Sequence, residues 1–142
     1  MLHLEVRHFY KNRGIEKMLE DKTLLEAKPV IERISGNESI AYQLCWRDIV
    51  LQASKQSLPP ALEKRHAFLL ELERVLHHLT DLGFIPNDAG FGAALTFASK
   101  LAEDARRMMK TVTDHRFGFA AITFLNRPVD TVSIQEWIGE MQ

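Results

Sequence analysis

Residues 60–83 read PALEKRHAFLLELERVLHHLTDLG, the longest stretch of the chain with helical periodicity. At about 100° per residue, its large apolar side chains fall on one broad, continuous face. A face this wide needs packing partners on more than one side, so we expect a central helix over residues 60–82. Gly83 is predicted to cap this helix and Pro86 to stop it. The apolar face comprises Leu62, Phe68, Leu69, Leu72, Val75, Leu76, Leu79 and Leu82.

Helical periodicity predicts two further helices, over about residues 37–55 and 89–112. The second is rich in alanine, which allows another helix to approach closely. Thr23 and Glu26 have the spacing of a capping box, so a short helix is expected after Thr23, ending near Pro29.

The ends of the chain depart from this helical pattern. The alternating stretch LHLEVRHFY at residues 2–10 predicts a half-buried strand, followed by a helical turn over residues 14–20. Residues 116–125 are short and aromatic and are predicted to be extended, whereas a short helix is expected over residues 134–141. We therefore expect one mainly α domain over residues 1–142, built around a long central helix, with a small extended or β element.

Composition narrows the class of protein. The 142 residues are 46% hydrophobic and 26% charged, which is typical of a folded globular domain and excludes a disordered chain. The net charge of −1 offers no basic field for nucleic acid, and no apolar run is long enough for direct membrane insertion. Cys45 is the single cysteine, so no internal disulfide can form, and a cytoplasmic location is expected.

A column of polar side chains borders the apolar face of the central helix. His66, Glu73 and His77 project within about 40° of one another, and Glu73 and His77 form an i,i+4 pair. A carboxylate beside two imidazoles could bind a metal or relay protons. The alternative is a solvated helix edge with one weak charged pair.

Five stretches of the chain match, in order, the motifs of a known family of proteins. The stretches are NRGIEK at 12–17, PVIERISGNES at 29–39, ELERVLHHLTDLG at 71–83, NDAGF at 87–91 and HRFGF at 115–119. They resemble the large subunit of membrane-bound, energy-converting [NiFe] hydrogenases of the formate-hydrogenlyase type, which is homologous to the D subunit of NADH-quinone oxidoreductase (complex I). The resemblance covers about residues 4–125 and implies a helix-rich domain that is only part of a complete family member.

The departures from the family concern its metal site. In the hydrogenases the arginine that matches Arg33 precedes a Cys-x-x-Cys that binds the nickel–iron centre, but here Ser35 and Glu38 stand at the two thiolate positions. Oxygen groups replace bridging thiolates poorly, and Ser35 with Glu38 could instead form a capping box. The family's second cysteine pair corresponds to positions beyond residue 142, and Gly36 stands where the complex I branch has a quinone-binding tyrosine. We expect neither a metal nor another cofactor.

Two residues keep the family's functional pattern. Glu16 matches the proton-transfer glutamate of the hydrogenases, and Arg33 lies beside the former metal loop. The alternative for Glu16 is an ordinary glutamate of a first helical turn in water.

The resemblance implies a component of a membrane-associated redox complex that serves in proton coupling or as a scaffold. Its partners would be iron–sulfur and membrane subunits, which would hold it at the cytoplasmic face of the membrane. The alternative is a non-catalytic interaction domain or relic that dimerises or binds a partner through surfaces that a complete subunit would bury. As an isolated chain, we expect the protein to be enzymatically inactive.

Overall fold

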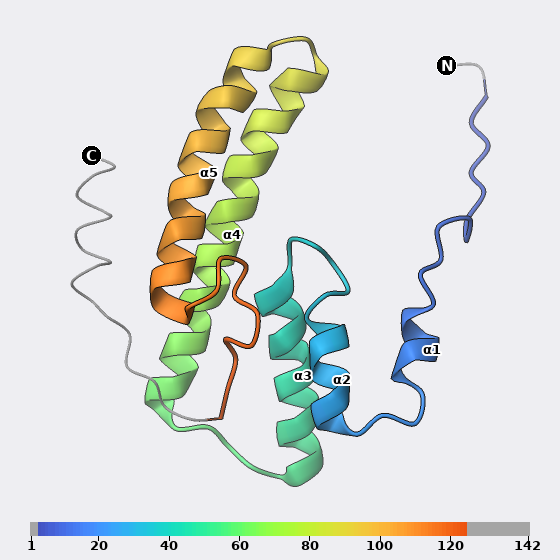
Figure 1. The fold of residues 1–142 in the computed structure, drawn as a ribbon, viewed down its shortest axis with the longest axis vertical. Helices are drawn as coiled ribbons and strands as arrows, with labels where there is room; N and C mark the ends of the chain where they lie inside the picture. Colours follow the sequence, from blue (N-terminus) through green and yellow to red (C-terminus); the bar gives the residue numbers. More distant parts are fainter. Residues whose placement is uncertain (1–2, 125–142) are drawn as a thin grey trace.

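The computed structural model describes residues 3–124 of the chain (Figure 1). Most of these residues are helical, which confirms the mainly α fold. The helices of this range are α1 (Ile15–Leu19), α2 (Leu24–Ile31), α3 (Ser39–Ser54), α4 (Pro60–Asp88) and α5 (Gly92–Thr113).

Helices α4 and α5 form a long antiparallel hairpin, and the remaining helices lie beside its lower half (Figure 1). Helix α4 contacts both α5 and α3, whereas α2 packs on α3 and α1 packs on α2. The main apolar core lies where α3, α4, α5 and the segment after α5 meet. It comprises Ile40, Leu44, Leu69, Leu72, Met108, Met109, Ala121 and Ile122.

Helix α4 is longer than its sequence signals suggest. It passes through Gly83 and Pro86 and ends at Asp88, so the predicted C-cap at Gly83 and the predicted stop at Pro86 are wrong. A Cβ placed on Gly83 would lie 2.8 Å from the Cβ of Ala98 in α5. Gly83 therefore serves the close approach of two helices, which local sequence rules cannot distinguish from a helix end.

Helix α2 begins as its sequence predicts. The Thr23 hydroxyl accepts a hydrogen bond from the Glu26 amide at 3.4 Å, and the Glu26 carboxylate accepts one from the Thr23 amide at 2.9 Å. This reciprocal capping box is the one that was expected. Pro29 does not end the helix, which continues to Ile31, although a proline inside a helix removes one backbone hydrogen bond and crowds the carbonyl of the preceding turn.

The expected extended or β element is not confirmed, because residues 3–124 contain no strand. Residues 3–10 are exposed, and a strand needs a neighbouring strand for its backbone hydrogen bonds. The backbone of residues 116–124 forms hydrogen bonds with side chains of other parts of the chain instead of with a neighbouring strand. Gln43 donates to the Gly118 carbonyl at 2.8 Å and accepts from the Ile122 amide at 3.1 Å.

The helix predicted over residues 134–141 lies outside the described residues. Within the described range, no helix has both the length and the apolar composition needed to cross a membrane.

Replacement of Gly83 by alanine tests the contact between α4 and α5. Alanine normally stabilises a helix relative to glycine, but here we expect Gly83→Ala to lower the free energy of unfolding by about 1–3 kcal/mol through overpacking. Urea denaturation measures the change. Gly92→Ala is the control, because the added Cβ would meet only the Asn87 side chain at 3.8 Å. A stabilising Gly83→Ala, or no recovery when Ala98→Gly is added, would contradict this account of the contact.

Candidate functional site

Three of the five stretches of the resemblance contribute residues near the C-terminal end of α2. Arg33 follows this helix, and its guanidinium donates to the Pro29 carbonyl at 2.7 Å and forms an ion pair with Glu32. The same guanidinium lies over the ring of Phe119, 4.2 Å from its centroid. Arg33 therefore joins the end of α2 to the segment after α5, 86 positions further along the chain.

Glu32 is the residue of this site that sequence reasoning missed. It is only 3% exposed, and its carboxylate accepts a hydrogen bond from the Ala120 amide at 2.7 Å while it pairs with Arg33. The signal for it was present in the sequence, since Glu32 precedes Arg33 within the PVIERISGNES stretch. A glutamate at the end of a helix nevertheless resembles an ordinary surface residue until its distant partner is known.

The HRFGF stretch folds into a turn that is fixed by its own polar side chains. The His115 Nδ1 accepts hydrogen bonds from the amides of Phe117 at 3.1 Å and Phe119 at 3.4 Å. Arg116 forms a two-pronged ion pair with Glu103 of α5, at 2.7 and 2.6 Å. These contacts hold Phe119 where it meets Arg33.

The glycine of this stretch is required by its position. Gly118 has a φ of +66°, and a Cβ on it would lie 2.6 Å from the Ile40 side chain. Left-handed backbone and close packing against α3 both favour glycine here.

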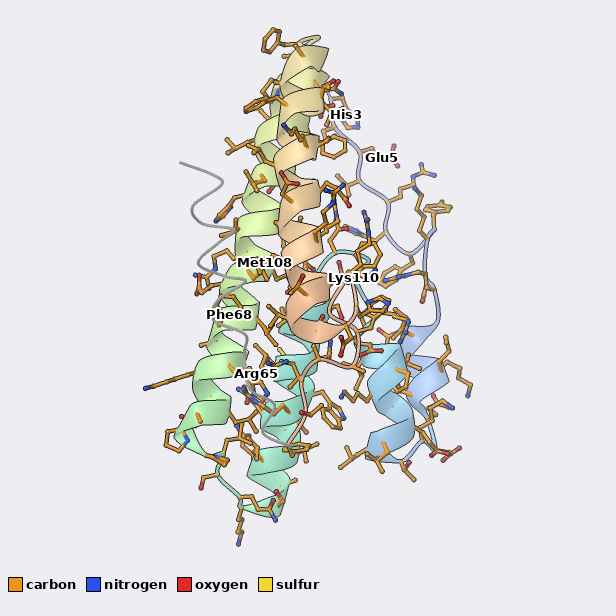
Figure 2. All side chains as sticks on the ribbon, turned by 60° about the vertical axis from the view of Figure 1, so that its left-hand side comes forward. His3, Glu5, Arg65, Phe68, Met108 and Lys110 are labelled. Carbon is orange, nitrogen blue, oxygen red and sulfur yellow. The ribbon has the colours of Figure 1, made fainter. Side chains whose placement is uncertain are left out.

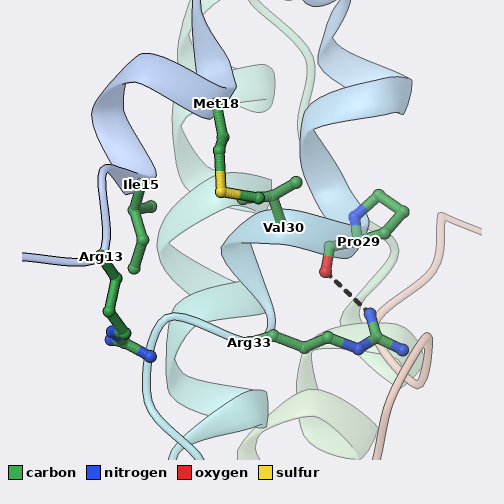
Figure 3. Close-up of a pocket in the computed structure, with 6 residues that line it drawn as sticks. All are labelled: Arg13, Ile15, Met18, Pro29, Val30 and Arg33. Atoms are coloured by element: carbon green, nitrogen blue, oxygen red, sulfur yellow. Dashed lines mark hydrogen bonds between the residues drawn. The ribbon is translucent and has the colours of Figure 1, made fainter.

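A groove of about 500 Å³ runs between α1 and α2 beside Arg33 (Figure 3). Its walls are mostly apolar, and Arg13 and Arg33 contribute a guanidinium from each side. The Arg13 guanidinium also donates to the Ile34 carbonyl. The lining residues are Arg13, Ile15, Met18, Pro29, Val30 and Arg33.

Glu16 lies on α1 as an exposed carboxylate. It lines a neighbouring hollow together with Arg13 and Ile34. Because Arg13 borders both hollows, the structure places Glu16 and Arg33 in one region of the surface. Proton transfer through Glu16 stays a prediction.

The loop between α2 and α3 carries Ser35 and Glu38, the two positions that the resemblance matches to thiolates of the hydrogenases. Ser35 is half-buried and Glu38 is exposed. The capping box expected between them is not formed, because α3 begins at Ser39 and Glu38 makes no side-chain cap. Among residues 3–124, no group of three or more histidine, cysteine, aspartate or glutamate side chains is placed to hold a metal ion.

The cap of α3 comes instead from Glu73 of α4. Its two carboxylate oxygens accept hydrogen bonds from the amides of Ile40 at 2.7 Å and Ala41 at 2.9 Å. A carboxylate at the N-terminus of a helix is favourable, both as an acceptor for free N–H groups and in the field of the helix dipole. Burial raises the pKa of Glu73, and the two amide donors oppose this rise.

His66 and His77 of α4 contact α3 and the loop before it. The His66 Nδ1 lies 2.8 Å from an Arg47 guanidinium nitrogen in α3, and the His77 Nε2 lies 3.0 Å from the Asn37 carbonyl oxygen before α3. Together with Glu73, these contacts run in order along α4 and in reverse order along α3. The polar column therefore fixes the antiparallel register of the two helices, and a proton relay along it stays a prediction.

His66 is 1% exposed, and its environment disfavours the charged ring. Burial, followed by the positive charges of Arg47 and Arg65, lowers the pKa of His66 to about 4. Its Nε2 is buried and has no hydrogen-bond partner of ordinary geometry. The backbone of Thr123 acts to raise the pKa of His66, but the lowering effects are larger. The imidazole is therefore neutral at pH 7 and accepts from Arg47 through Nδ1.

Comparisons with known proteins agree with the resemblance seen in the motifs. The chain is 27% identical over 124 residues to the D subunit of F(420)H(2) dehydrogenase of Methanosarcina mazei, covering 87% of this chain and 33% of the relative. It is 27% identical over 132 residues to the D subunit of NADH-quinone oxidoreductase of Campylobacter curvus, covering 93% of this chain and 32% of the relative. It is 26% identical over 117 residues to formate hydrogenlyase subunit 5 of Escherichia coli K12, covering 82% of this chain and 21% of the relative.

The chain is thus a distant homologue of the D subunits of NADH-quinone oxidoreductase and F(420)H(2) dehydrogenase and of formate hydrogenlyase subunit 5, and the predicted resemblance is confirmed. It spans between about a fifth and a third of the length of these relatives. No family model matches the chain. No solved structure gives a significant match.

Removal of the Glu73 carboxylate should destabilise the fold. Glu73→Ala leaves two amides at the start of α3 without acceptors, and we expect a loss of about 2–3 kcal/mol in the free energy of unfolding. Glu71→Ala on the same helix removes only an exposed pair with Arg74 and should cost less than about 1 kcal/mol. Equal losses in the two variants, measured by urea denaturation, would show that Glu73 does not cap α3.

His66 should make the stability of the protein depend on pH. Its folded-state pKa of about 4 lies below the ordinary value of 6.5, so between these values the unfolded chain binds the additional proton. Its contribution is therefore complete above pH 6.5 and is lost as the pH falls towards 4, by up to about 3 kcal/mol.

Urea denaturation at pH 7 and at pH 4.5 compares the native chain with His66→Gln. The variant should lose less stability on acidification, whereas His78→Gln, at an exposed position of the same helix, should behave as the native chain does. The raised pKa of Glu73 acts in the opposite direction, but it is common to all three proteins and cancels in the comparison. Identical acid sensitivity of the native chain and His66→Gln would rule out this role.

Proposed function

We propose that this chain is a component of a membrane-associated redox complex, similar to the D subunits of its relatives and without a nickel–iron centre of its own. One observation carries the proposal: most of the chain aligns with subunits of three different redox complexes. The partners would be iron–sulfur and membrane subunits, which would hold the protein at the cytoplasmic face of the membrane.

The arrangement of the motifs supports a scaffold role. Arg13, the Glu32–Arg33 pair and Phe119 come from three separate motifs, and they gather around one end of α2. Their contacts are made with backbone carbonyls, an amide and an aromatic ring. Such contacts hold a surface in a defined shape for a partner.

We propose that the chain has no metal centre of its own because of the side chains at the two ligand positions. Ser35 and Glu38 offer a hydroxyl and a carboxylate at positions where the hydrogenases have thiolates. Hard oxygen donors do not support the bridging ligation that a nickel–iron pair requires. The isolated chain would then have no hydrogenase activity.

Proton coupling is the second part of the proposal, and Glu16 is the residue that would serve it. Its exposed carboxylate lies beside Arg13, at a surface that a partner subunit could cover. Covering by a partner would shield the carboxylate from bulk water, and a carboxylate in such a site can accept and release protons.

A second candidate is a non-catalytic interaction domain, including a homodimer. The turn end of the α4–α5 hairpin favours it, because Phe84, Ile85 and Phe91 are 50%, 69% and 62% exposed there. Clustered apolar side chains at the end of a projecting hairpin are typical of a contact surface.

Purification of the tagged protein from its native locus distinguishes the two candidates. We expect iron–sulfur and membrane subunits to co-purify with the chain in mild detergent. A native mass that corresponds to one or two copies of the chain, without such subunits, would overturn the redox-complex proposal and favour the interaction domain.

Glu16→Gln tests proton coupling in the purified complex. We expect proton transfer per electron to slow by at least about tenfold while the complex still assembles. Glu20→Gln is the matched control, because this exposed carboxylate follows the same short helix and pairs only with Lys17. If Glu16→Gln leaves the rate of proton transfer unchanged, the proposed coupling role is wrong, and only the scaffold role is retained.

A further inference from the structure

Residues 3–8 form an exposed segment that precedes α1 and lies clear of the helices in Figure 1 (His3 and Glu5 are labelled in Figure 2). Leu4 and Val6 of this segment are 70% and 61% exposed. Within the described part of the chain, the backbone N–H and C=O groups of residues 3–8 form no hydrogen bond with another segment. These groups are therefore available to pair with a strand of another polypeptide.

The side chains of this segment alternate between a polar and an apolar side. In an extended chain, Glu5 and Arg7 share one side, while Leu4 and Val6 share the other. The structure agrees for the polar side, because the Arg7 Nε donates to the Glu5 Oε1 at 2.5 Å. A strand of this pattern suits a sheet that has one apolar and one solvated side.

The sequence around Val6 is complementary to itself in an antiparallel arrangement. Pairing of two copies about Val6 places Glu5 of each copy opposite Arg7 of the other, so both cross-strand pairs join opposite charges. On the apolar side, Val6 lies opposite Val6 of the second copy, and Leu4 lies opposite His8. The four charges alternate in sign, because Glu5 and Arg7 of one strand are neighbours as well.

Other registers of the two strands are less favourable. Pairing about Glu5 or about Arg7 places like charges directly opposite each other, which is destabilising. Pairing about Leu4 leaves Arg7 without an acidic residue opposite it. A shift by one residue brings the polar side of one strand against the apolar side of the other. The charge pattern therefore favours one register and a second copy of this chain as the occupant.

Phe9 limits the length of the paired stretch. It has a φ of +71°, and its carbonyl accepts a hydrogen bond from the Asn12 amide at 3.2 Å, so the chain turns there. The basic side chain of Lys11 follows this turn and lies outside the paired stretch. A stretch over residues 4–8 has the usual length of a strand, but a ribbon of only two strands is marginally stable in water. We therefore expect a weak association that depends on protein concentration.

We propose that two copies of this chain pair through residues 4–8 as an antiparallel ribbon centred on Val6. Each copy contributes the same surface, as in most symmetric dimers. The second copy supplies the neighbouring strand that the alternating sequence calls for and that residues 3–124 of one chain do not contain. The pairing uses a different surface from the turn end of the α4–α5 hairpin, and it does not rest on the redox-complex proposal.

Charge reversal in the full chain tests the register. Glu5→Arg and Arg7→Glu each place like charges opposite each other, and we expect each to raise the dissociation constant of the dimer at least about fivefold. An equimolar mixture of the two variants restores both opposite-charge pairs, so it should associate as the native chain does. Sedimentation equilibrium measures the dissociation constants. Glu20→Arg is the matched control, because it makes the same change in charge at an exposed pair with Lys17.

Disulfide formation locates the centre of the ribbon and detects a weak dimer. Cys45 is exposed, so the background is Cys45→Ser. In this background, Val6→Cys should cross-link two copies severalfold faster than Leu4→Cys. The two copies of position 6 lie opposite each other, whereas the two copies of position 4 lie about 13 Å apart along the ribbon, beyond the reach of a disulfide.

Three results would overturn the proposal. Association that neither charge reversal weakens would assign the dimer to another surface, such as the turn end of the hairpin. Equal rates of cross-linking at positions 4 and 6 would show that the strands have no defined register. A native chain that stays monomeric at the highest attainable concentration, with no cross-linking of Val6→Cys, would show that the segment does not pair with a second copy. None of these results depends on whether redox subunits co-purify, so failure here is distinct from failure of the proposed function.

Discussion

The buried carboxylate of Glu73 is the interaction on which the arrangement of the helices depends. It lies on α4, is 4% exposed, and accepts the first free amides of α3. Those amides would otherwise be buried without acceptors, and such a helix end is costly. Because a carboxylate has only two oxygens and a short reach, this contact defines both where α3 begins and where it crosses α4. The contacts of His66 and His77 then fix the direction of α3 along α4.

The helices could be predicted from the sequence to the extent that their signals are local. The periodic apolar face of residues 60–82 indicated α4, and Thr23 with Glu26 indicated the start of α2, because both patterns are complete within a few turns. The end of α4 could not be predicted, since Gly83 has the same local signature whether it caps a helix or admits Ala98 of α5. The cap of α3 could not be predicted either, because its acceptor lies 33 positions away.

The residues of the candidate site also divide into those with a local sequence signal and those whose partners are distant in sequence. The sequence indicated Arg33 and Glu16 through their motifs, and it missed Glu32, whose partner Ala120 lies 88 positions away. It also indicated an extended segment over residues 116–125, because an aromatic, β-branched stretch resembles a strand. In the structure, Gln43, Glu32 and Lys28 bond to the backbone of this stretch, so it needs no neighbouring strand.

Contacts at both ends of the loop between α2 and α3 fix its shape. At one end, Arg33 is held by the Pro29 carbonyl, Glu32 and the ring of Phe119. At the other end, His77 contacts the Asn37 carbonyl, and Glu73 holds the start of α3. The loop that carries Ser35 and Glu38 is therefore fixed on both sides by protein groups. A loop of this kind can serve as a scaffold surface, and this supports the proposed role more directly than the identity of any single residue does.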